Sequence, residues 1–101
     1  MAEKLVAKRS EIPDGAAQRY VVDGTEVLLC NVGGEIYAVE DICTHDGGAL
    51  DQGELEGARI VCPRHGANFD VRTGEALTLP AVIPLPTYTV RVADDDIYVT
   101  I

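Results

Sequence analysis

The segment Cys62-Pro63-Arg64-His65 carries one thiol and one imidazole, and the earlier segment Cys43-Thr44-His45 carries a second such pair. Residues 46–61 separate the two segments. The chain contains only two histidines and three cysteines, so both histidines stand beside two of the three cysteines. This placement predicts a metal site with four protein ligands: Cys43, His45, Cys62 and His65.

Two thiolates and two imidazoles can hold either a single tetrahedral zinc ion or a [2Fe-2S] cluster in which imidazoles replace two thiolates. Structural zinc sites usually pair like ligands within each half of the motif, as C-x2-4-C followed by H-x3-5-H. Here each half mixes one sulfur with one nitrogen. A two-iron cluster explains the mixing, because each segment would give its cysteine to one iron and its histidine to the other.

The pattern C-x-H, a gap, then C-x2-H resembles the cluster-binding signature of Rieske proteins. Gly47 and Gly48 after the first pair and the whole stretch Cys62–Asp70 agree with it. The segment Phe69–Glu75 and the proline-rich stretch that follows resemble small Rieske-type ferredoxins, so the resemblance covers nearly the whole chain.

This resemblance implies an all-β, Rieske-like antiparallel β-sandwich that forms a single domain of residues 1–101. A small cluster-binding subdomain, about residues 41–80, is inserted between its strands. The resemblance also implies one [2Fe-2S] cluster per chain, bound by Cys43, His45, Cys62 and His65. In respiratory Rieske proteins two more cysteines and a serine surround the cluster. Gly48, Arg64 and Ala67 stand at the corresponding places, which predicts a low reduction potential within the Rieske range of roughly −150 to +300 mV.

The remainder of the sequence independently predicts an all-β protein. Short runs rich in β-branched and aromatic residues alternate with Gly, Pro and Asp. Tight turns are expected at Asp23-Gly24, Gly33-Gly34 and Asp94-Asp95-Asp96, and a loop with one helical turn at 10–15. The predicted strands are Lys4–Lys8, Gln18–Val22, Thr25–Asn31, Ile36–Glu40, Arg59–Val61, Asn68–Val71, Thr87–Val92 and Ile97–Thr100.

Composition narrows the classes of function. The net charge of −9, from 17 acidic and 8 basic residues, argues against nucleic acid and anionic membranes as partners. The acidic surface either steers docking onto a basic redox partner or provides solubility. No apolar run is long enough for a membrane span. With Cys43 and Cys62 assigned to metal, no cysteine pair remains for a disulfide, so we expect a cytoplasmic protein with Cys30 inert in the core.

The leading hypothesis is a monomeric one-electron carrier that is not itself an enzyme. The resemblance implies the ferredoxin component of a bacterial multicomponent ring-hydroxylating oxygenase, with an NAD(P)H-dependent flavin reductase and a terminal oxygenase as partners. A Rieske oxygenase is excluded, because its catalytic iron needs two further histidines and none remains. Two alternatives stay open: the small Rieske-like subunit of an NADH-dependent nitrite reductase, and a zinc-stabilised interaction module.

Overall fold

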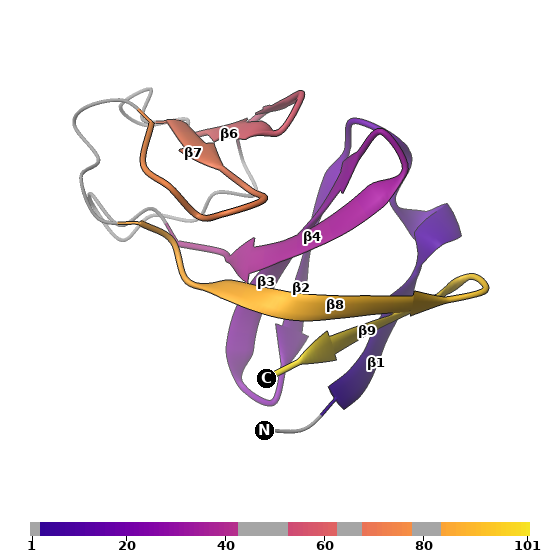
Figure 1. Cartoon of the computed structure of the whole chain (residues 1–101). Helices are drawn as coiled ribbons and strands as arrows, with labels where there is room; N and C mark the ends of the chain where they lie inside the picture. Colours follow the sequence, from indigo (N-terminus) through magenta and orange to yellow (C-terminus); the bar gives the residue numbers. More distant parts are fainter. Residues whose placement is uncertain (1–2, 43–52, 63–67, 78–83) are drawn as a thin grey trace.

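The computed structural model describes residues 3–42, 53–62, 68–77 and 84–101. The described part of the chain is built from β-strands and one short 3-10 helix (Figure 1). In chain order the elements are β1 (Glu3–Lys8), η1 (Arg9–Glu11), β2 (Ala17–Val22), β3 (Thr25–Val32), β4 (Glu35–Glu40), β5 (Leu55–Glu56), β6 (Arg59–Val61), β7 (Asn68–Asp70), β8 (Thr87–Ala93) and β9 (Asp96–Thr100).

Six strands form one antiparallel sheet in the order β1-β9-β8-β4-β3-β2. The sheet is strongly bent (Figure 1), and an ion pair of 3.4 Å between Lys4 on β1 and Asp23 in the β2–β3 turn links its two edge regions. A first apolar core fills the inside of the bend, with Val27 and Leu29 of β3 packed against Ile97 and Val99 of β9.

The second sheet is small and antiparallel, in the order β5-β6-β7. Ile60 of β6 and Phe69 of β7 are fully buried in a second apolar core, together with Leu28 and Cys30 of β3. Strand β3 is therefore buried on both faces, because successive side chains point to opposite sides of a sheet. This explains the unbroken apolar run Val27–Cys30, which alternation alone would not produce.

The predicted all-β antiparallel fold is confirmed. All eight predicted strands are present, and seven of them have one end displaced by one residue. Val71 lies beyond β7, whereas Asp96 opens β9, so Asp94 and Asp95 alone form that turn. The turns at Asp23-Gly24 and Gly33-Gly34 have positive φ as expected. The predicted helical turn is η1, which begins at Arg9. No helix in the described ranges is long and apolar enough to cross a membrane.

Candidate metal centre

Cys62 is the one predicted ligand that lies within the described residues. Cys62 directly follows β6 and is only 1% exposed, because it lies in the core between the two sheets. Its thiol is free of any disulfide. The other three predicted ligands, Cys43, His45 and His65, lie outside the described residues, as do Gly47, Gly48, Arg64, Gly66 and Ala67.

The pairing of β6 with β7 fixes where the second ligand segment begins and ends. Val61 is paired with Asn68, so residues 62–67 connect two adjacent antiparallel strands at one end of the small sheet. Cys62 starts this connection from a buried position among apolar side chains. A free, shielded thiol at the start of a short connection fits a thiolate ligand of a [2Fe-2S] cluster or of zinc.

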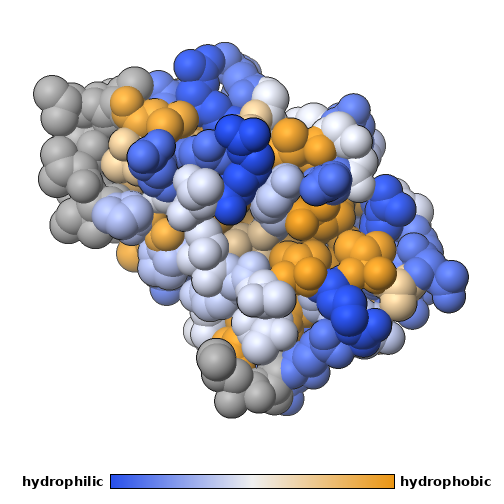
Figure 2. Space-filling view, in the orientation of Figure 1, coloured by the Kyte–Doolittle hydropathy of each residue, from blue (hydrophilic) through white to orange (hydrophobic). Residues whose placement is uncertain are grey.

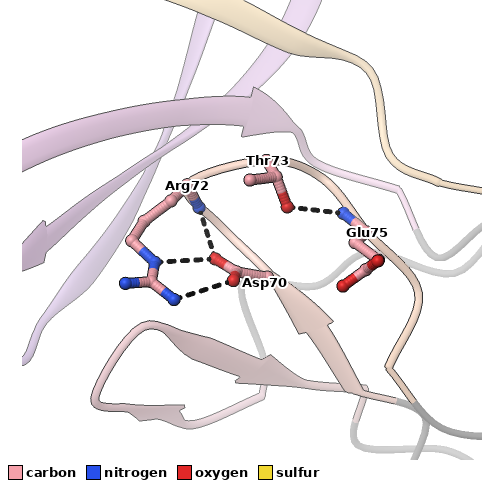
Figure 3. A network of polar contacts seen from close by, with 4 residues as sticks. All are labelled: Asp70, Arg72, Thr73 and Glu75. Atoms are coloured by element: carbon pink, nitrogen blue, oxygen red, sulfur yellow. Dashed lines mark hydrogen bonds and ion pairs between the residues drawn. The ribbon is translucent and has the colours of Figure 1, made fainter.

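A dense polar turn follows β7, at the end of the small sheet opposite to the connection of residues 62–67 (Figure 3). The carboxylate of Asp70 accepts hydrogen bonds from Nε and Nη2 of Arg72 at 3.1 and 3.0 Å, and from the Arg72 backbone N–H at 2.9 Å. These bonds hold the pKa of Asp70 below its usual value. The Thr73 hydroxyl accepts a further bond from the backbone N–H of Glu75. The hydrogen bonds of Asp70 and Thr73 are therefore made within the turn itself.

Gly74 joins this turn to the segment that leads into β8. Its φ is 80°, its N–H donates to the Asp70 carbonyl at 2.6 Å, and its carbonyl accepts from the Leu85 N–H at 2.7 Å. Pro84 directly precedes Leu85, and residues 78–83 lie outside the described ranges. Gly74 thus connects the small sheet to the proline-rich segment.

The first ligand segment leaves the large sheet at Asp41, a residue that the sequence analysis did not single out. The Asp41 side chain is fully buried and forms an ion pair of 3.2 Å with Nε of Arg19. The contact is an ion pair and not a directed hydrogen bond to Oδ2 of Asp41. Arg19 also pairs with Glu26. No local pattern could reveal this group, since Arg19 and Asp41 meet only through the pairing of β2, β3 and β4.

Cys30 lies in the same core as Cys62, as predicted for an inert apolar position. Burial, followed by the nearby charge of Asp41, raises the pKa of the Cys30 thiol to about 12. The thiolate form is therefore scarce at neutral pH. Cys30 provides packing, whereas Cys62 stands at the start of the ligand segment.

The sequence and the fold can both be compared with those of known proteins. Residues 2–89 match the sequence family described as the Rieske [2Fe-2S] domain. The chain is 42% identical, over all of its length and 96% of the relative, to the 3-phenylpropionate/cinnamic acid dioxygenase ferredoxin subunit of Photorhabdus laumondii.

Two solved structures are also similar. The ferredoxin of carbazole 1,9a-dioxygenase from Nocardioides aromaticivorans is 34% identical with a TM-score of 0.94, covering 99% of this chain and 98% of that one. A chain in a complex of reduced oxygenase and oxidized ferredoxin of carbazole 1,9a-dioxygenase is 35% identical with a TM-score of 0.90, covering 97% of this chain and 92% of the other.

Proposed function

Because the chain belongs to the Rieske [2Fe-2S] domain family, we propose that it is the ferredoxin component of a multicomponent dioxygenase system. In this role it carries single electrons from an NAD(P)H-dependent flavin reductase to a terminal oxygenase, and it has no substrate site of its own. The match with a dioxygenase ferredoxin subunit over essentially the full length of both chains carries the proposal. The assignment of a flavin reductase as a partner rests on the sequence resemblance alone.

In this proposal Cys43, His45, Cys62 and His65 hold one [2Fe-2S] cluster, which when bound supplies one-electron redox chemistry. The small sheet, with the segments on either side of it, forms the cluster-binding subdomain of a single domain. The buried side chains of Ile60 and Phe69 shield Cys62, the first residue of the second ligand segment, from water. The mixed donor set and the buried, unbridged Cys62 support this assignment.

Charge supports a basic redox partner. Six cations in the described ranges are each paired with a carboxylate of this chain: Lys4, Lys8, Arg19, Arg59, Arg72 and Arg91. With a net charge of −9, the remaining carboxylates dominate the long-range field, which favours association with a positively charged surface. The proposed carrier is a cytoplasmic monomer, in keeping with the free thiols of Cys30 and Cys62.

A redox titration followed by electron paramagnetic resonance tests the proposal. The purified protein should hold two irons and give a Rieske-type signal on reduction, with a midpoint near the low end of the range of roughly −150 to +300 mV. Cys62→Ser should abolish or strongly weaken the signal, because an alcohol is a much poorer ligand for iron than a thiolate. Cys30→Ser is the matched control: it changes the other described buried cysteine and should leave the signal in place.

Other outcomes separate the alternatives. One bound zinc and no reduced signal in the wild-type protein would replace the electron carrier with a zinc-stabilised module. Stable co-purification with a large reductase subunit would support the small subunit of a nitrite reductase instead. Loss of the signal in both serine variants would leave Cys62 without a specific role.

A further inference from the structure

We infer that the ion pair between Arg19 and the buried side chain of Asp41 positions the first ligand segment, and that both are positioning residues for the bound cluster. The inference rests on the proposed function. It concerns two side chains that lie outside the ligand motif: Arg19 belongs to β2, and Asp41 directly follows β4.

Asp41 stands where the chain leaves β4 toward Cys43. Its backbone N–H donates to the Glu26 carbonyl at 2.9 Å, which extends the β3–β4 pairing one residue past the end of β4. The next residue, Ile42, donates to the Glu40 carbonyl at 2.9 Å, and Glu40 donates to the Pro86 carbonyl at 3.0 Å. The backbone is thus held on both sides up to the residue before Cys43.

The side chain of Asp41 adds a third attachment at the same point. It is 0% exposed, whereas that of its partner Arg19 is 39% exposed and reaches inward from the edge strand β2. Arg19 is opposite Leu28 in the β2–β3 pairing, which places it on the face of the sheet that carries the core beneath the small sheet. Glu26 holds the guanidinium from the solvent side.

Burying a carboxylate at this point costs free energy, although the chain could leave the sheet without a charged side chain there. A buried carboxylate loses its hydration, and an ion pair with a half-exposed arginine returns little net stability, so apolar residues of similar size would often serve as well for folding alone. A charged pair does provide a fixed direction and distance between two strands. Groups that hydrogen-bond directly to metal ligands typically change metal affinity by about 10- to 100-fold when removed. We expect a similar loss for this pair, which holds the backbone shortly before Cys43.

The test compares the rate of cluster loss among variants that all fold. Arg19→Gln and Asp41→Asn should release iron to a chelator about 10- to 100-fold faster than the wild type, the range for groups that orient ligands. Both should also change the g-values or the linewidth of the reduced signal. Arg19→Lys keeps the charge and should restore most of the wild-type behaviour.

Two controls separate positioning from general destabilisation. Arg59→Gln removes an exposed ion pair with Glu56 from β6, the strand that leads to Cys62, and should release iron at the wild-type rate. Val99→Ala weakens the other core, inside the bend of the large sheet; it should lower the unfolding temperature without changing the reduced signal.

The outcomes are distinct. The inference is wrong if Arg19→Gln and Val99→Ala have equal unfolding temperatures and release iron at the same rate. It is also wrong if the reduced signal of Arg19→Gln is that of the wild type. In both cases the proposed function stands. If the wild-type protein holds no [2Fe-2S] cluster, the proposed function fails and the inference falls with it.

Discussion

Replacing Gly74 with alanine should weaken the attachment of the small sheet more than the same change at any open turn. Gly74 has a φ of 80°, and a Cβ built there would overlap the carbonyl oxygen of Leu85 and lie 3.0 Å from Cγ2 of Thr87. Gly24 provides the matched control: its φ is 81°, and a Cβ there would meet no atom within 4 Å. The two variants share the backbone strain, and only one adds the overlap.

The two contributions can be sized separately. Placing an L-residue in the left-handed region costs about 1–2 kcal/mol, and both variants carry this cost. Forcing the Leu85 segment away from Gly74 is an overpacking change, typically about 1–3 kcal/mol, and it also strains the 2.7 Å bond from the Leu85 N–H to the Gly74 carbonyl. We therefore expect Gly74→Ala to lose about 2–5 kcal/mol and Gly24→Ala about 1–2 kcal/mol.

Equilibrium urea unfolding followed by circular dichroism measures both losses. Hydrogen exchange adds a local test, because the Leu85 amide should lose protection in Gly74→Ala and keep it in Gly24→Ala. Equal losses of unfolding free energy in the two variants, with an unchanged Leu85 amide, would refute the reasoning. That result would mean that the segment before β8 gives way freely and that Gly74 serves only the turn.

Three further predictions concern the side chains of Cys30, Asp70 and Asn31. Cys30→Val should reduce the loss of unfolding free energy between pH 9 and 12. In the wild type the folded pKa of the Cys30 thiol is raised to about 12, so ionisation of the thiol in the unfolded chain favours unfolding over this range. Identical alkaline unfolding curves for the two proteins would contradict this. Asp70→Asn should destabilise the protein at pH 7 but less as the pH falls below 3.8, since the Arg72 bond holds the folded pKa of Asp70 down and its contribution is lost on protonation; thermal unfolding from pH 2 to 7 measures the difference. Asn31→Ala should cost about 2–4 kcal/mol in urea unfolding, because its buried amide bonds to two backbone groups; a loss below 1 kcal/mol would show that water replaces them.

The local sequence was sufficient to predict most strands. Runs such as Thr25–Asn31 and Thr87–Val92 consist of residues that favour extended backbone, and the turn at Asp23-Gly24 is marked by residues that accept positive φ. The exception was β5, Leu55–Glu56, which contains only two residues and depends on pairing with β6. So short a strand has no pattern of its own.

The candidate site divides in the same way. The four ligands Cys43, His45, Cys62 and His65 were predicted from residue type and spacing, because metal chemistry restricts the donors; for Cys62 the structure adds burial at the end of β6. The Arg19–Asp41 pair gave no signal, since charged residues are common at strand ends and nothing local indicates which of them meet.

By itself the sequence determined the all-β class of the chain, its turns and the type of metal ligands, all of which follow from residues close together along the backbone. Tertiary structure alone decided the strand order, with β1 beside β9 and β4 beside β8. It also decided the packing of the small sheet on Leu28 and Cys30, the close approach of Gly74 to Leu85 and the burial of Asp41. These contacts join distant segments, and they form because burying apolar faces against one another offsets the entropy of closing the loops between them.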